Sequence, residues 1–468
     1  MSIQDSTFRD VGGYMCRLHP LERNLKHMLK SRKGVLAGVG VAALSLLATV
    51  VTAVGPAKAA ANCEPFASYK GLKGKTVTIF TSILEPELTT LNTAMADFMS
   101  CTGIKVKIEG SNQFEALLPV RVKGGNAPDL AWIPQPGLLA KMVATGKVVP
   151  APASVLANVN KYWSSSWKDL GSVNGKFYAA PFGSNMKSLV WYSPKQFKAN
   201  GYSVPKTWDE MTALADKMAA NKQIAFCGGL GSGGATGWPA TDWVEQIVLR
   251  EYGAGVYNDW VSHKVTFSDP KIVSAMQKVA AWMQNPKWVG DVKAIATTSF
   301  QDAGKGIPTG KCMMLQQASF YGNILAAEGA TISESGDVFA FYLPATNSTV
   351  SVPVVGGGEF TAAFAKRPEV VAVQTYLSSP TFATARVQLD HWVSANSGVP
   401  LAAYKDPIDR LAAQYLSNPK STFGFDASDL MPAAVGAGAE WKEFTAWFGE
   451  GKSIADVTRA IDAAWPKS

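Results

Sequence analysis

The sequence has few of the residues that bind transition metals. Its 468 residues include four histidines and five cysteines, and only His263 and His391 lie beyond an N-terminal segment that we expect to be removed. The cysteines are scattered, without the short spacings by which zinc sites are recognised. The sequence therefore predicts no metal site and no cofactor.

Charged residues are also scarce. They make up 17% of the chain against 47% hydrophobic residues, which is the balance of a globular protein and excludes a disordered one. No stripe of Lys and Arg interleaved with aromatic residues is present, so nucleic acid is not an expected partner. Residues 1–61 hold eight Lys/Arg and three acidic residues, and without them the formal net charge falls from +8 to +3. The rest of the chain has no internal repeat and no low-complexity tract.

The N-terminal segment has the features of a secretory signal. Residues 34–55 carry no charge, follow the basic stretch "LKSRK", and precede small residues that offer cleavage sites near 57–61. A start at Met28 would give a conventional basic region. We therefore expect export to the periplasm or the extracellular space. Because the apolar run is somewhat long for a signal, an uncleaved membrane anchor is the alternative.

Four cysteines remain after this segment, and an even number in an exported chain predicts disulfides. Three pairings are possible. We prefer Cys63–Cys101 and Cys227–Cys312, because each bond then stays within one lobe of the layout described below. Cys63 could instead carry a lipid anchor, but Asn62 stands where a lipid-attachment motif has a small residue.

The first third of the mature chain alternates between strands and helices. Apolar or alternating runs predict strands at 76–81, 104–110 and 128–133, and helical spacing predicts helices at 86–101 and 113–124. This order favours a parallel sheet with helices on its faces, where ligands bind beyond the carboxyl ends of the strands. That rule places near a site the residues Thr81, Ser82, Glu85, Trp132 and Gln135.

A second unit begins near residue 187. Thr207 and Glu210 form a capping box that opens a helix to about 221. Strands are predicted at 188–193, 224–227, 312–317 and 338–343. Further helices are predicted at 240–252, 270–284, 368–379, 404–417, 437–449 and 453–464.

A glycine-rich stretch, "GSGGATGWPATDW" at 231–243, stands between a predicted strand and helix. Gly229, Gly231 and Gly234 fit the dinucleotide pattern G-x-G-x-x-G. We reject that interpretation because the loop runs on past Trp238 before the expected helix, lies mid-chain, and belongs to an exported protein. Glycines also let backbone groups approach an uncharged polyol closely.

Two side chains of this stretch suit a sugar. The Trp238 ring offers an apolar face, and the Asp242 carboxylate accepts paired hydroxyl hydrogen bonds. The alternatives are that Trp238 packs in a core and that Asp242 belongs to the first helical turn.

Several segments resemble the extracellular solute-binding proteins of the maltose-binding type, the carbohydrate receptors of ABC importers. The segment 174–211 has the family's Tyr-x-x-Pro crossing, its Leu-x-Trp-Tyr strand and its Pro-x-Thr-Trp-Asp-Glu helix start. Residues 125–149 and 429–444 are similar to two further family segments, and the resemblance covers about 75–465. The motifs "ANCEP", "GWPATDW", "FQDAG" and "RPEV" are most similar to the alpha-glucoside-binding branch.

The resemblance implies a two-lobe α/β fold of the type II periplasmic-binding-protein kind, each lobe a mixed sheet flanked by helices, joined by hinge strands. It implies a monomer that binds a carbohydrate between its lobes and delivers it to membrane permease subunits, without catalysis. The lobes would comprise 62–183 with about 352–403, and 184–351 with about 404–468, after a leader of 1–61. Carried over by position, the ligand-binding residues would be Glu85, Trp132, Gln135, Asn185, Trp238, Gln317, Phe320 and Trp441.

Two departures from the family pattern leave the sugar undefined. Asn185 stands where an acid is common, and Ser82 to Glu85 replaces an expected Asp-Lys pair. An exported glycoside hydrolase is one alternative, for which Glu85, Asp242 and Glu359 would be the candidate carboxylates. A receptor for a metal, polyamine or phosphate ester is another, and it predicts a carboxylate or tyrosine cluster or a basic pocket. Lys187 is interpreted as a solvated residue beside the hinge.

Overall fold

The structure, a computed structural model, describes residues 63–389 and 391–467, and these residues belong to one compact unit. The predicted signal segment and its cleavage sites lie outside the described residues. Within the described part, no helix combines the length and apolar character that crossing a membrane requires.

The first sheet has five strands in the order β2-β1-β3-β12-β6. β1 is parallel to β2 and β3, whereas β12 is antiparallel to β3 and β6. The parallel part confirms the three predicted strands, and the late strand β12 was not predicted. The bounds are β1 (Thr76–Thr81), β2 (Lys105–Gly110), β3 (Leu130–Ile133), β6 (Ala179–Pro181) and β12 (Phe360–Ala363).

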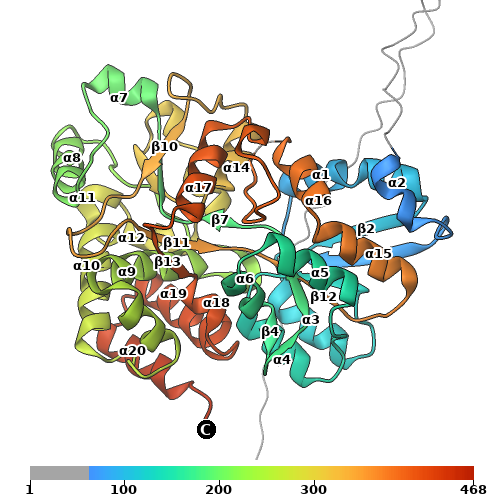
Figure 1. The fold of residues 1–468 in the computed structure, drawn as a ribbon. Helices are drawn as coiled ribbons and strands as arrows, with labels where there is room; N and C mark the ends of the chain where they lie inside the picture. The colour runs from blue at the N-terminus through green and yellow to red at the C-terminus, as the bar shows by residue number, and fades with distance from the viewer. Residues whose placement is uncertain (1–62, 390, 468) are drawn as a thin grey trace, which may run out of the picture. The chain divides into compact units, whose positions relative to one another are not determined.

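Helices cover this sheet (Figure 1). The helix predicted over 86–101 is interrupted at Met95 and forms two helices, and the second ends at Gly103 as expected. Two late helices, α15 and α16, join this layer, and α16 lies beside α1. The bounds are α1 (Glu87–Ala94), α2 (Ala96–Thr102), α3 (Phe114–Lys123), α4 (Pro136–Ala144), α5 (Ala153–Tyr162), α6 (Ser165–Leu170), α15 (Pro368–Leu377) and α16 (Pro380–Val387). A small hairpin, β4 (Ser172–Val173) and β5 (Lys176–Phe177), follows α6.

Two further sheets have the strand orders β10-β8-β9 and β13-β11-β7. The strands near 188–193, 312–317 and 338–343 are confirmed, but the strand expected at 224–227 is reduced to an isolated bridge from Phe226 to Met314. The bounds are β7 (Asn185–Met186), β8 (Leu189–Tyr192), β9 (Met314–Gln316), β10 (Phe339–Tyr342), β11 (Pro353–Gly357) and β13 (Thr422–Phe425).

Helix α9 (Trp238–Val261), which is interrupted by non-helical backbone at Gly253, begins directly after Gly237. The expectation that the glycine loop runs past Trp238 is therefore wrong, because Trp238 and the following proline form the first helical turn, where a missing N–H costs nothing. The other helices are α7 (Pro194–Asn200), α8 (Trp208–Ala220), α10 (Pro270–Met283), α11 (Pro286–Val289), α12 (Val292–Thr297), α13 (Phe300–Ala303), α14 (Tyr321–Ala327), α17 (Pro407–Ser417), α18 (Ala427–Leu430), α19 (Trp441–Gly449) and α20 (Ile454–Ala463). A π-helical turn at Val435–Glu440 leads into α19.

Within the described ranges, the chain passes between the first sheet and the other sheets at three places. β6 leads into β7, β11 leads into β12, and the segment after α16 forms a bridge from Val393 to Ser184. The first two passages touch: a Cβ atom on Gly358 would lie 2.2 Å from the carbonyl oxygen of Gly183. This close approach requires glycine at 358. The division into lobes stays a prediction.

Both preferred disulfides are present. Cys63 is bonded to Cys101, with 5.3 Å between the Cα atoms, and Cys227 is bonded to Cys312, with 5.5 Å. The first bond ties the start of the described chain to α2, and the second ties the segment before the glycine loop to the approach to β9. The Cys63 sulfur is thus used in a disulfide and not in a lipid anchor.

We predict that Gly358→Ala destabilises the protein. The added methyl group would meet a backbone oxygen that cannot rotate away, and such overpacking costs about 1–3 kcal/mol. The measurement is the free energy of unfolding in urea. Gly255→Ala is the control for an added methyl group that meets nothing within 4 Å, and because Gly255 lies in α9 this variant should be at least as stable as the wild type. Equal stability of the two variants would contradict a tight crossing of the two passages.

Candidate functional site

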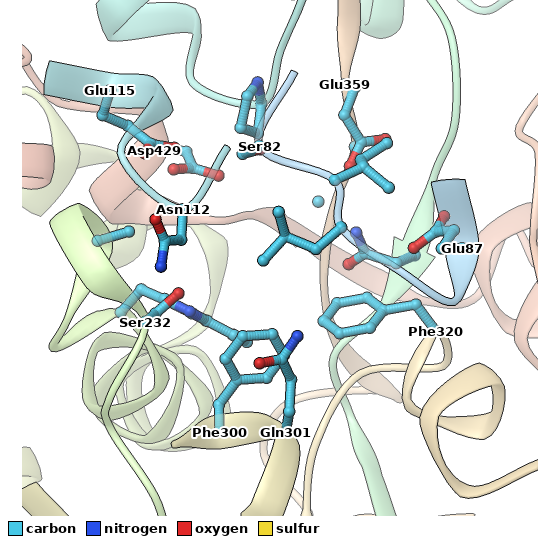
Figure 2. A pocket seen from close by; sticks show the side chains of 18 of the residues that line it. Ser82, Glu87, Asn112, Glu115, Ser232, Phe300, Gln301, Phe320, Glu359 and Asp429 are labelled. Atoms are coloured by element: carbon cyan, nitrogen blue, oxygen red, sulfur yellow. The ribbon is translucent and has the colours of Figure 1, made fainter. Parts of the chain in front are cut away.

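A cleft of about 170 Å³ lies at the carboxyl ends of β1, β2 and β3 (Figure 2). One water requires on the order of 10–15 Å³ of such space, so the cleft accommodates a small solute in place of many waters. Its position fits the rule for ligands of parallel sheets. The polar residues that line it are Ser82, Glu85, Glu87, Ser111, Asn112, Glu115, Gln135, Asn185, Lys187, Ser232, Gln301, Asn323, Glu359, Asp426 and Asp429.

One wall of the cleft comes from loops that follow strands of the first sheet. Glu85 and Glu87 follow β1, Asn112 follows β2, and Gln135 follows β3. The Glu85 carboxylate also accepts a hydrogen bond of 3.1 Å from the backbone N–H of Thr89, in the first turns of α1. The end of each parallel strand therefore contributes at least one polar side chain to the same space.

Aromatic rings form part of the opposite wall. Trp238, Phe300 and Phe320 make a cluster, with ring centroids 5.2 Å apart for Trp238 and Phe300 and 6.2 Å apart for Trp238 and Phe320. All three rings are half-buried, and Trp441 lines the cleft as well. Figure 2 shows Phe300 and Phe320 along one side of the cleft, across from Ser82. An apolar surface thus faces the polar strand-end loops.

Lys187 forms part of the floor and is buried. Its Nζ donates to the Asp242 Oδ1 at 2.7 Å and to the Asp426 Oδ2 at 2.5 Å, and it lies 5.0 Å from the centroid of the Trp238 ring. Burial acts to lower the pKa of Lys187, but the two carboxylates raise it well above its usual value. The interpretation of Lys187 as a solvated residue is therefore wrong, because two buried acids replace water around its ammonium group.

The cleft is strongly acidic. Six of its lining residues are Asp or Glu, and Lys187 is the one cationic side chain among the described residues that line it. Burial, with the neighbouring Glu87 carboxyl, raises the pKa of Glu359 to about 7. Burial also raises the pKa of Glu115, although Gln135 donates to its Oε1 at 3.2 Å. Figure 2 shows Glu115 near Asp429 and Glu359 on the side of Glu87.

Four buried polar groups at the cleft have no hydrogen-bond partner in the described part of the chain. Two are acceptors, the Gln135 Oε1 and the Asn185 Oδ1, and two are donors, the Asn323 Nδ2 and the Trp441 Nε1. Their residues are between 3% and 9% exposed, and all four line the cleft. Since an unpaired buried polar group costs free energy, the cleft is matched to a ligand that both donates and accepts hydrogen bonds.

The structure brings six of the eight sequence-predicted ligand residues together at this cleft: Glu85, Gln135, Asn185, Trp238, Phe320 and Trp441. Trp132 does not line it, because its ring points into the core and stacks on Phe182 at 4.2 Å. Gln317 does not line it either. Its Oε1 accepts from the backbone N–H of Ala318 at 2.8 Å, so its amide oxygen is already used.

Other lining residues were not predicted as ligand contacts. Asn112 and Glu115 follow the second predicted strand, so the strand-end rule applies to them as well as to Gln135. Asn323, Asp426 and Asp429 come from later helices and loops, and no local pattern in the sequence distinguishes them.

Among the residues that the structure describes, two groups of side chains have the composition of a metal site. Asp242, Glu245 and Asp426 bring carboxylate oxygens within 4.8 Å of one another, but the Lys187 ammonium group contacts two of these residues and supplies the positive charge. In the second group, with His391, the carboxylates of Asp406 and Asp409 accept backbone N–H bonds and have structural roles. The geometry gives no reason to place a metal in either group.

We predict that Glu359 makes stability depend on pH. Because folding raises the pKa of its carboxyl from 4.5 to about 7, ionisation opposes folding, and stability falls as pH rises from about 4.5 to 7. Glu359→Gln removes this loss. The melting temperature of the variant minus that of the wild type should therefore increase between about pH 5 and pH 7 and then level off. Glu450→Gln, at an exposed position, is the control. A pH-independent difference for Glu359→Gln would refute the raised pKa.

Comparison with known proteins gives a family match. A family model described as bacterial extracellular solute-binding protein matches residues 83–383. The chain is 35% identical over 422 residues to the alpha-glucosides-binding periplasmic protein AglE of Rhizobium meliloti, covering 86% of this chain and 90% of that protein. It is 35% identical over 398 residues to the osmoprotective compounds-binding protein GgtB of a Synechocystis strain, covering 84% and 93%.

Solved structures show the same fold. A maltose-bound protein from T. maritima superposes with a TM-score of 0.63 over 83% of this chain and 98% of that one, at 16% sequence identity. At this identity the likeness concerns the fold, and it confirms the expected type II periplasmic-binding-protein architecture of mixed sheets flanked by helices.

Proposed function

We propose that this chain, which belongs to the bacterial extracellular solute-binding proteins, binds a carbohydrate in its cleft and delivers it to the permease of an ABC importer. The ligand class is an alpha-glucoside or a small oligosaccharide. The name of AglE, to which the chain is 35% identical, supports the first of these. Export, a periplasmic or extracellular location and a monomeric state belong to the same proposal.

The observation that carries the proposal is the mixture of unpartnered donors and acceptors in the cleft. A hydroxyl group donates one hydrogen bond and accepts others, so neighbouring hydroxyls of one sugar can satisfy the Asn185 oxygen and the Asn323 nitrogen together. The Trp238, Phe300 and Phe320 rings then supply an apolar surface for the C–H face of the ring.

A cationic cargo is the second candidate, and one observation favours it. Six acids line the cleft, and a carboxylate cluster is the feature that a polyamine or metal receptor predicts. A cation, however, has no acceptor to offer the donors on Asn323 and Trp441, and it would leave both unsatisfied. The carboxylates also suit a sugar, because ionised acceptors make the stronger hydrogen bonds to hydroxyl groups.

Glycoside hydrolysis is the third candidate. It needs two carboxyl groups that flank one glycosidic bond, one of them protonated near neutral pH. Glu359 has such a pKa, but the family match and the relatives are binding proteins, which favours reversible binding. A turnover assay on the saccharides that bind separates these two hypotheses.

We predict that neutral saccharides stabilise the mature protein and that cations do not. The measurement is a thermal-shift panel of sucrose, trehalose, maltose, monosaccharides, spermidine and divalent metals, followed by calorimetric titration. A ligand at 100 times its dissociation constant adds about 2.7 kcal/mol. A shift with spermidine or a metal alone would overturn the carbohydrate proposal.

Asn323→Ala should weaken the binding of the saccharide that gives the largest shift. Losing one hydrogen bond in a buried site costs about 1–3 kcal/mol, or roughly 5- to 150-fold in affinity. Asn126→Ala is the matched control, since that asparagine is exposed and outside the cleft. Equal affinity of both variants would remove Asn323 from the site.

A further inference from the structure

One contact closes the cleft far from the chain passages. The backbone N–H of Gly234, in the glycine loop, donates to the backbone carbonyl oxygen of Asn112 at 2.7 Å. Asn112 belongs to the loop after β2, and Asn112 and Ser232 both line the cleft. Figure 2 shows these two residues on the same side of the cleft. The hydrogen bond therefore joins the two walls at the edge of the ligand space.

The strand order places this contact at the far edge of the first sheet from the chain passages. β2 is at one edge of the first sheet, whereas β6 and β12, through which the chain passes to the other sheets, are at the opposite edge. If the walls rotate about the passages, the loop after β2 moves furthest. A bond formed there has the largest effect on the angle between the walls.

The contact near the passages is of a different kind. There the Phe425 ring packs against Trp167 and Phe360, with centroids 5.7 Å and 6.0 Å apart. Phe425 and Phe360 are buried, so separating them would expose apolar surface to water. Gly233, Gly234 and Asn112, by contrast, are exposed, and water can replace their hydrogen bond. The contact between Gly234 and Asn112, at the rim of the cleft, therefore separates more easily than the aromatic contacts near the passages.

Gly233 is what allows the loop to reach Asn112. Its φ is +57°, a conformation that side chains with a Cβ atom rarely adopt. A Cβ atom there would lie 2.4 Å from the Asn112 carbonyl oxygen and 2.9 Å from the Asn112 Cβ. The first of these is backbone, so a side-chain rotation would not relieve the clash.

From these observations we infer that the glycine loop acts as a latch, meaning that its hydrogen bond from Gly234 to Asn112 stabilises the closed cleft. Gly233 is a positioning residue, because its backbone conformation places Gly234 against Asn112. The loop contacts the facing wall through a hydrogen bond between two backbone groups, and ligand contacts would then add to a closure that the bond from Gly234 to Asn112 already favours. The effect of this latch on affinity rests on the proposed function, but the latch itself does not.

The test compares Gly233→Ala with Gly201→Ala. The Gly201 position has φ +65° and no atom within 4 Å of the added Cβ, so the control shares the backbone strain without the clash. Hydrogen exchange of the peptide that contains Gly234 is measured without ligand and with a mixture of sucrose, trehalose and maltose. We expect faster exchange of that peptide in Gly233→Ala than in the wild type under both conditions, and wild-type exchange in Gly201→Ala.

Binding kinetics give the second readout. If the saccharide mixture contains a ligand, that ligand should dissociate about tenfold faster from Gly233→Ala than from the wild type. The reason is that overpacking destabilises the closed form by an amount that corresponds to about a tenfold change in rate or more. Wild-type exchange at Gly234 in Gly233→Ala would overturn the latch. Faster exchange without any saccharide binding would support the latch and leave the carbohydrate proposal without support. Faster exchange in peptides throughout Gly233→Ala, and not only in the peptide that contains Gly234, would instead assign Gly233 to overall stability and also overturn the inference.

Discussion

The ammonium group of Lys187 is held between the carboxylates of Asp242 and Asp426, and the geometry of the cleft depends on this trio. Lys187 follows β7 at the passage between sheets, Asp242 lies in α9, and Asp426 precedes α18. The three come from distant parts of the chain and are all buried. Because an isolated buried charge is costly, each member is stable there only while the others are present. The trio therefore fixes how α9 and α18 meet the passage.

Several features of the site follow from that fixed floor. The Trp238 ring lies over the ammonium group, and Phe300 packs against that ring, so the position of Lys187 also influences the position of the aromatic cluster. The unpartnered amides of Asn185 and Asn323 stand around the floor, where a ligand can pair with them. The two regions have different roles in a receptor. The floor around Lys187 determines which protein groups contact the ligand, and the rim at Gly234 and Asn112 determines whether the ligand can enter. Differential affinity for the closed form is what allows a ligand to shift such an equilibrium.

The sequence predicts most of the first sheet, because its strands are uniformly apolar or alternating and are separated by amphipathic helices. It also predicts Glu85 and Gln135 at the cleft, since both follow strands at the edge where ligands bind. Trp132 shows the limit of that rule: it lies within β3, and its side chain points to the core where it stacks on Phe182.

Contacts between distant segments are outside such reasoning. Asp426 lies 239 positions from Lys187, and no local pattern connects the two. The glycine loop was recognised as unusual from its composition, but its contact with Asn112 depends on where β2 ends in space. The disulfides were predictable because four cysteines allow three pairings and the preferred one keeps each bond within one predicted lobe. Asn323 and Asp429, by contrast, reach the cleft only through the packing of late helices.

The most direct test of this account is the free energy of unfolding of Lys187→Met, measured in urea at neutral pH. Removing the ammonium group leaves Asp242 and Asp426 buried and uncompensated, so we expect a loss of about 3–5 kcal/mol. The variant Lys187→Met with Asp242→Asn and Asp426→Asn should recover most of it, because no unpaired charge remains. A loss below about 1 kcal/mol in Lys187→Met, the range of an exposed ion pair, would contradict the role of the trio.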